Sequence, residues 1–262
     1  MVQLRDGSTV EDPRLGRLVQ FDEASRSYPI RAAGVLSRPR SYTWRIVVTW
    51  VIDQYREGAC IGLGITNEAQ CRPSEVDFGS KLAAEKFGRE QIYWGAQRID
   101  PWPGGSYPGA SPRYEGSSVL AGMKVAQRLG YFREYRWAFG LQDVVHGIGH
   151  NGPAVLGINW YDTMYSPAGG WISPRRGRVV GGHAILARAV KILWLNKALA
   201  GTWAGVDLDR SYVVLRNSWG ISWGDHGDAK LTLSDLGWLL DQQGEAVFAV
   251  DRVAKPRVGA VI

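Results

Sequence analysis

The sequence predicts an α+β protein with two lobes, a helix-rich N-terminal lobe and a β-rich, barrel-like C-terminal lobe, with a cleft between them. Helical patterns are concentrated before residue 140, and short apolar strands follow from about residue 141. The chain has 262 residues, and its hydrophobic content of 45% is enough for one large domain or two packed halves. We therefore divide it into an N-terminal extension (1–43), a helix-rich lobe (44–140) and a β-rich lobe (141–262).

The helix-rich lobe begins with residues 44–52, which alternate and then become apolar. This pattern predicts a strand that leads into a polar turn. Pro73 ends the first expected helix, Ser117 or Ser118 can cap the last, and Gly130 follows its end. Helices are expected over 61–70, 81–97 and 119–129.

The β-rich lobe contains short apolar runs bounded by turn residues, which are typical of strands. The segment 191–210 is interpreted as an elaborated hairpin, and the aromatic segment 131–139 is expected to be extended. Strands are expected over 154–158, 184–187, 212–215 and 246–250.

A polar turn, 53–59, delivers Cys60 to the start of the first expected helix. The partial positive charge of a helix N-terminus favours the thiolate over the thiol. A single cysteine before an apolar run is more often a small core residue. Two later motifs favour a catalytic role, namely Gly182-His183-Ala184 and Asn217-Ser218-Trp219-Gly220, because a histidine can carry the proton for a reacting thiol and an asparagine can orient the histidine.

On these motifs the sequence resembles the papain family of cysteine peptidases, in particular short bacterial and bacteriophage members without disulfides. Gln54 and Cys60 have the spacing of the family's oxyanion-hole glutamine and nucleophile, and Trp223-Gly224 extends the asparagine motif. The match covers about residues 44–250 and implies the papain-like two-lobed fold. The sequence departs from the family at Glu57-Gly58-Ala59-Cys60-Ile61, which lacks the usual second cysteine and the aromatic residue after the nucleophile.

The resemblance implies a role for each matching residue. Cys60 would be the nucleophile, His183 the proton carrier and Asn217 the group that orients the imidazole. The Cys60 backbone N–H and the Gln54 side chain would bind the oxyanion. Substrate contacts are expected from Gly116, Ser117, Gly182, Trp219 and Trp223. The alternatives are plain structural roles: Gln54 in a turn, Asn217 as a turn cap, and Trp223 in packing.

The remaining histidines and cysteines do not predict a metal or cofactor site. His146 and His150 are four residues apart in a glycine-rich stretch and have no glutamate partner, so we expect solvated side chains and no metal. Cys60 and Cys71 would be roughly 16 Å apart on one helix, too far for a disulfide. Two free thiols predict a reducing compartment, and we expect Cys60 to be unusually acidic and Cys71 to be buried.

The composition limits the expected partners. The net charge of +6 is not concentrated in an arginine–lysine block, so nucleic acid is not expected, and no apolar run is long enough for a membrane span. The N-terminus lacks the apolar core of a signal peptide. We expect a peptide or protein substrate, other particle proteins if the chain belongs to a phage, and a location in the host cytoplasm or the virion rather than secretion through a signal peptide.

The leading hypothesis is a thiol-dependent peptidase that uses a Cys-His-Asn site and an acyl-enzyme intermediate. One alternative is a hydrolase or transferase acting on cell-wall peptides with the same residues. Another is a phage particle component that uses the papain fold as a scaffold or for binding, since fold does not fix function. The presence of Gln54, Cys60, His183 and Asn217 favours an enzyme.

The N-terminal extension is polar and contains three prolines. It is shorter than the helical pro-segments of secreted papain relatives, and it shows no long amphipathic helix. Such a segment buries little apolar area. We therefore expect residues 1–43 to pack along the outside of the β-rich lobe and the full-length chain to be competent without processing.

Overall fold

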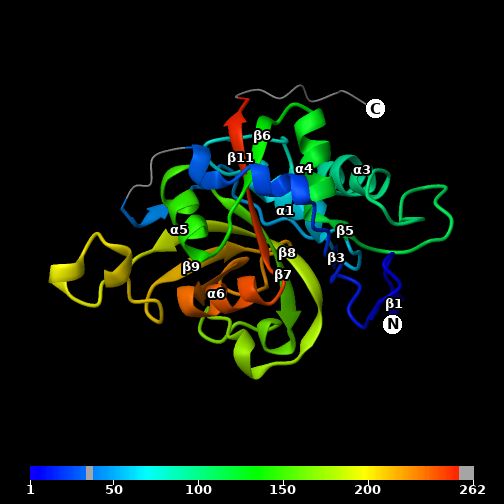
Figure 1. The fold of residues 1–262 in the computed structure, drawn as a ribbon. Coiled ribbons are helices and arrows are strands. Elements are labelled where there is room, and N and C mark those ends of the chain that lie inside the picture. Colours follow the sequence, from blue (N-terminus) through cyan, green and yellow to red (C-terminus); the bar gives the residue numbers. More distant parts are fainter. Residues whose placement is uncertain (34–37, 254–262) are drawn as a thin grey trace.

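The computed structural model describes residues 1–33 and 38–253. A large antiparallel sheet forms one part of the fold, and helices α1, α3 and α4 lie together beside it (Figure 1). The helices are α1 (Cys60–Ala69), α2 (Lys81–Lys86), α3 (Trp94–Gln97), α4 (Val119–Arg128), α5 (Leu141–His150) and α6 (Leu233–Asp241). The strands are β1 (Val2–Gln3), β2 (Thr9–Val10), β3 (Arg17–Leu18), β4 (Tyr42–Thr43), β5 (Ser117–Ser118), β6 (Phe132–Trp137), β7 (Ala154–Tyr161), β8 (Val179–Lys191), β9 (Tyr212–Arg216), β10 (Asp228–Thr232) and β11 (Glu245–Arg252).

The large sheet follows the order β10-β9-β8-β7-β11-β6, with β4 paired to β8. The predicted α+β class is confirmed, and all four strands predicted for the β-rich lobe lie in this sheet. Within the described residues the sheet has β10 at one edge and β6 at the other. Because these two edge strands do not pair with each other, the predicted barrel-like shape is not confirmed. The segment 191–210 joins the antiparallel neighbours β8 and β9, as a hairpin requires.

Helix α1 is buried along its whole length. It packs closely against β8. A Cβ atom added at Gly64 would lie only 3.7 Å from the backbone of Ala184. The predicted helix 61–70 is therefore confirmed, with Gln70 as its C-terminal cap. This packing places the first residue of α1 beside the middle of the sheet.

The other predicted helices are also found. Residues 81–97 form α2, a π-helical stretch (Phe87–Tyr93) and α3 without interruption. The Ser118 hydroxyl caps α4 by accepting a hydrogen bond of 3.1 Å from the Ala121 N–H. The helices α5 and α6 and the strand β10 were not predicted, because glycines and polar residues interrupt their patterns.

The predicted strand over 44–52 is wrong. The regular strand in this region is the short β4, and the residues after it are held by separate contacts. The Trp44 indole donates to the Ile148 carbonyl over 2.7 Å, and the Val47 N–H donates to the Gln70 carbonyl over 3.0 Å. The alternation in the sequence therefore reflects packing of individual side chains and not a sheet ladder.

Both cysteines are free and buried. Cys71 lies just after α1, and its thiol donates to the Trp44 carbonyl over 3.3 Å. None of the helices in residues 1–33 and 38–253 has the length and hydrophobicity needed to cross a bilayer.

Candidate active site

Cys60 is the first residue of α1, and its side chain is fully buried. Ala59 precedes it and caps the helix without a side-chain hydrogen bond. The free N–H groups at a helix start carry partial positive charge, so a nucleophilic sulfur is well placed there. The backbone of Ala184 acts to lower the pKa of this thiol, which places the start of α1 near the residue that follows His183 on β8.

His183 and Asn217 form the second part of the site. His183 lies in β8, and Asn217 follows the end of the neighbouring strand β9. The His183 Nε2 and the Asn217 Oδ1 are 2.8 Å apart, and the same oxygen accepts a hydrogen bond of 2.8 Å from the Ser218 N–H. The other ring nitrogen, Nδ1, has no hydrogen-bond partner among the described residues. One imidazole nitrogen of His183 is thus fixed by an amide oxygen.

Tryptophan rings exclude water from the His183–Asn217 hydrogen bond. The centroid of the Trp219 ring lies 4.9 Å from that of His183, and the Trp160 ring lies 4.7 Å from it. Trp223 is buried and packs 6.1 Å from Trp219. Trp160 was missed by sequence reasoning, because a tryptophan inside an apolar strand is usually a core residue. In this closed arrangement Trp223 is a packing residue of the cluster.

Gln54 is held in one orientation by two donors. Its side-chain oxygen accepts hydrogen bonds from the Ser218 hydroxyl over 2.8 Å and from the Trp219 indole over 3.2 Å. These contacts turn the amide nitrogen away from the Ser218–Trp219 turn, toward the Glu57 carbonyl at 2.8 Å and the Arg14 carbonyl at 3.0 Å. Gln54 therefore presents an N–H donor beside the start of α1, as an oxyanion site requires.

The chain's own N-terminal segment occupies this site. The Arg14 carbonyl accepts from Gln54, and the Gly16 backbone lies near the Cys60 sulfur, where it acts to lower the pKa of the thiol. The Gly16 carbonyl accepts from the Ser117 N–H over 3.0 Å, and the Arg17 carbonyl faces Gly182. The expectation that the extension packs outside the β-rich lobe is therefore wrong for residues 12–18. These residues do not need a long amphipathic helix, because an extended chain can bind through backbone hydrogen bonds.

The direction of this segment through the site is defined at both ends. At one end, the Arg14 guanidinium lies 3.9 Å from the centroid of the Trp219 ring, and it forms a 2.6 Å ion pair with Asp12. At the other end, β3 pairs in parallel with β5. Further toward the N-terminus, buried Arg5 forms a 2.5 Å ion pair with Asp100 in the helix-rich lobe. The segment is thus anchored on both sides of Cys60.

Of the residues predicted to contact substrate, Gly116, Ser117 and Gly182 contact the backbone or side chains of this segment. Ser117 and Gly116 lie along Gly16 and Leu18, and Gly182 lies along Arg17. They form the two walls of the groove in which residues 16–18 lie.

Burial determines the protonation of the two central groups. It raises the pKa of the Cys60 thiol to about 11, although hydrogen bonds from the backbone of Ala184 and Gly16 act in the opposite direction. It also lowers the pKa of His183 to about 4, although the Asn217 hydrogen bond acts to raise it. The expectation of an unusually acidic thiol is therefore wrong for this closed arrangement. With the segment in place, both groups are neutral at pH 7.

No cluster of three or more metal-binding side chains occurs in the part of the chain that the structure describes. His146 and His150 stack on α5 with ring centroids 6.3 Å apart. The His150 ring nitrogen Nε2 contacts the Arg38 carbonyl over 3.1 Å.

Comparison with solved structures defines the class of fold, which is that of the papain-like cysteine proteases. Xylellain, a cysteine protease from Xylella fastidiosa, aligns over 94% of this chain and 98% of its own, with a TM-score of 0.61 and 15% identity. The digestive procathepsin L2 proteinase of Tenebrio molitor aligns over 95% and 82%, with a TM-score of 0.52 and 18% identity. The digestive procathepsin L 3 of the same insect aligns over 93% and 75%, with a TM-score of 0.51 and 13% identity. No protein-family model and no curated protein matches the sequence.

Proposed function

We propose that this chain is a thiol peptidase that hydrolyses peptide bonds through Cys60, His183 and Asn217. The observation that carries the proposal is the 2.8 Å contact between His183 Nε2 and Asn217 Oδ1 in a papain-like fold, beside a cysteine that begins a helix. The solved structures with this fold include cysteine proteases, which supports the same chemistry here. The oriented amide of Gln54 supplies the fourth group that amide hydrolysis needs.

The mechanism starts once residues 12–18 leave the site and a substrate enters. His183 takes the proton of Cys60, and the thiolate attacks the carbonyl carbon of the peptide bond. The oxyanion binds the Gln54 amide and the Cys60 backbone N–H. His183 then gives its proton to the leaving amine as the C–N bond breaks, and a thioester remains. Water attacks this thioester, His183 takes a proton from the water, and the carboxylic acid and the free thiol are released.

In this proposal the closed arrangement is an inactive form of the same enzyme. The Arg14 carbonyl lies where the Gln54 amide would bind an oxyanion, and Gly16 covers the sulfur. The segment is not a substrate in this pose. The leaving amine takes its proton from His183, so the part of a substrate after the cleaved bond lies toward Trp219. Here the N-terminal side, Arg14, lies there instead. The segment therefore runs opposite to a cleavable peptide.

The test is labelling of the chain carrying Gly16→Val, which loosens residues 12–18, with an epoxysuccinyl peptide that alkylates active-site thiols, followed by mass mapping. We expect labelling at Cys60, loss of labelling in Cys60→Ala and His183→Ala, and normal labelling in Cys71→Ala. Cleavage of a fluorogenic peptide should follow the same pattern. Labelling of Cys60 that does not depend on His183, together with no cleavage after removal of residues 12–18 from the site, would refute peptidase activity and favour a binding scaffold.

A further inference from the structure

Residues 2–10 of the extension form a small hairpin, in which β1 pairs with β2. The backbone of this hairpin is joined to the body of the protein at Glu115. The Arg5 N–H donates to the Glu115 carbonyl over 3.0 Å, and the Glu115 N–H donates to the Gln3 carbonyl over 3.2 Å. Glu115 directly precedes Gly116 and Ser117, which form one wall of the groove. The hairpin is thus attached to the residue from which that wall begins.

The Arg5 side chain is enclosed in a socket of the helix-rich lobe. Its guanidinium forms the 2.5 Å ion pair with Asp100, and neither side chain is more than 1% exposed. The same guanidinium also donates to three backbone carbonyls, which are those of Gln97 at 2.7 Å, Pro103 at 3.3 Å and Trp102. A carboxylate and three carbonyls therefore surround one side chain, and the several N–H groups of arginine can reach them where the single ammonium of lysine cannot.

Asp100 links this socket to the groove. The Asp100 oxygen that pairs with Arg5 also accepts a hydrogen bond of 2.7 Å from the Ser117 hydroxyl. The Ser117 N–H donates to the Gly16 carbonyl over 3.0 Å, so this N–H is placed to bind the backbone of a substrate in the same way. Arg5 is therefore connected through a single carboxylate to a residue that would hold the substrate.

The burial of Asp100 makes this connection depend on Arg5. Burial raises the pKa of Asp100, and the Ser117 hydrogen bond and the Arg5 charge act in the opposite direction. Arg5 is the one ion-pair partner of Asp100 within residues 1–33 and 38–253. A buried carboxylate that loses such a partner takes up a proton or changes its position. Either change would release the Ser117 side chain from its present orientation.

A second buried arginine of the extension, Arg17, has a different position. It forms a 3.0 Å ion pair with Glu245 at the start of β11. Arg17 lies in the groove, so it must leave with residues 12–18 before a substrate can enter. The side-chain contacts of Arg5 are instead with residues 97–103, so a substrate in the groove does not displace it.

We propose that Arg5 is a positioning residue of the active enzyme, and that residues 2–10 stay bound to the body when residues 12–18 leave the groove. This inference rests on the proposed peptidase function. The extension then has two opposite effects. Residues 12–18 close the site, whereas the hairpin supports the Ser117 wall that a substrate needs. Loss of the whole extension should therefore reduce activity, and displacement of residues 12–18 alone should release it.

The first experiment compares Arg5→Ala with the parent chain, both carrying Gly16→Val so that the groove is accessible. Cleavage of a fluorogenic peptide is measured per active site, as titrated with the epoxysuccinyl peptide. We expect Arg5→Ala to lower kcat/KM by about tenfold or more, chiefly by raising KM, because a hydrogen bond that binds the substrate backbone is misplaced. The rate of Cys60 alkylation by iodoacetamide, which does not use the Ser117 wall, should stay unchanged.

Refilling the socket gives a second readout. Methylguanidinium added to Arg5→Ala should restore cleavage toward the parent rate, because it carries the missing charge and N–H donors. Arg5→Lys should restore cleavage only in part, since one ammonium cannot reach all the acceptors. A loss that came from general destabilisation would respond to neither change.

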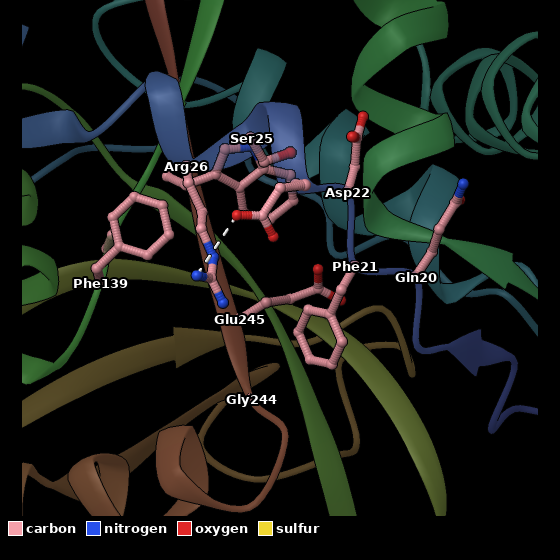
Figure 2. A pocket seen from close by; sticks show the side chains of 11 residues that line it. Gln20, Phe21, Asp22, Ser25, Arg26, Phe139, Gly244 and Glu245 are labelled. Atoms are coloured by element: carbon pink, nitrogen blue, oxygen red, sulfur yellow. Dashed lines mark ion pairs between the residues drawn. The ribbon is translucent and has the colours of Figure 1, made fainter.

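The matched control is Arg26→Ala in the same Gly16→Val background. Arg26 belongs to the same extension and pairs with Glu23 over 3.5 Å, and both side chains are largely exposed. Figure 2 shows Arg26 beside a cavity of about 410 Å³, between residues 20–26 and a wall that includes Phe139 and Glu245. This substitution removes an arginine at the surface, so kcat and KM should not change.

A cut in the chain tests whether the hairpin stays bound, and it does not require Arg5→Ala to fold. A sequence recognised by a specific protease is inserted between Val10 and Glu11 of the Gly16→Val chain, and the cut is made after folding. We expect residues 1–10 to elute with the body in gel filtration and the cut protein to keep its activity. Residues 1–10 that elute separately from a body of undiminished activity would overturn the proposal.

The other outcomes separate this proposal from the peptidase proposal. Equal kcat/KM in Arg5→Ala and its parent, or a loss that methylguanidinium does not reverse, would overturn the positioning role and leave the peptidase proposal intact. If the Gly16→Val chain cleaves no peptide and Cys60 is not labelled, the peptidase proposal fails and this inference fails with it.

Discussion

The amide nitrogen of Gln54 lies 3.0 Å from the carbonyl oxygen of Arg14, 40 residues earlier in the chain. This hydrogen bond joins the group that would stabilise the reaction's oxyanion to the segment that fills the cleft. Gln54 consequently has two roles that compete for one N–H donor. It holds the closed form, and it would serve catalysis in the open form.

Replacement of Gln54 by alanine should therefore change two measurements in opposite directions. Peptide cleavage should fall by about 100- to 1,000-fold, the usual loss for one oxyanion donor. Alkylation of Cys60 by iodoacetamide, which needs no oxyanion site, should become faster, because one hydrogen bond to residues 12–18 is lost. Gln127→Ala, in α4 near its C-terminal end, should change neither rate. A parallel fall of both rates would contradict the double role.

Gly16→Val should loosen the segment. A Cβ at Gly16 would lie 2.1 Å from the Gly58 carbonyl oxygen, so this position tolerates no side chain in the closed form. We expect Cys60 labelling by the epoxysuccinyl peptide to accelerate by about tenfold or more, since one overpacking substitution costs roughly 1–3 kcal/mol. Ser27→Val, at an exposed position of the same extension, serves as the control. An unchanged rate would mean that the segment does not limit access.

The pH dependence of alkylation should differ between the closed and loosened forms. In the full-length chain the thiol has a pKa of about 11, so Cys60 labelling by iodoacetamide should keep rising with pH above pH 9. In Gly16→Val the rise should move to lower pH, because exposure removes the cost of burying the thiolate. Cys71, whose pKa is raised to about 12 by burial, should stay slow in both proteins. A plateau below pH 7 for the unaltered chain would contradict this prediction.

His183 should make the protein less stable in acid. Burial lowers its pKa from 6.5 to about 4, so the unfolded chain binds a proton that the folded chain does not between these values. The stability from this group is fully present above pH 6.5 and is lost as the pH falls through 4. The difference corresponds to on the order of 3 kcal/mol.

Melting temperatures between pH 4 and pH 7 test this effect. The full-length chain should melt at higher temperature as pH rises, and His183→Gln should flatten the slope. His226→Gln alters an exposed histidine and should keep it. A slope that is the same in all three proteins would show that other groups control the acid response.

The residues that meet at the centre of the site were predictable because each lies in a short local motif. Gln54 and Cys60 share one turn, and His183 and Asn217 each follow a recognisable glycine or tryptophan pattern. The Arg17–Glu245 pair was not predictable, because 228 residues separate its members and neither stands in a motif. The path of residues 12–18 was missed for a related reason. This segment binds through its backbone carbonyls, which accept hydrogen bonds from Ser117 and Gln54. Such bonds do not depend on the side chains of the extension, so its sequence pattern does not predict them.

Because the segment in the cleft belongs to the same chain as Cys60, its hold on the site does not depend on how concentrated the protein is. A free inhibitor dissociates when it is diluted, but a tethered one keeps an effective concentration set by the length of its connection. Dilution therefore leaves each molecule closed to the same extent. Opening requires an event that acts on the tether itself, such as a cut in the extension or a competing surface that binds Arg17 and its neighbours.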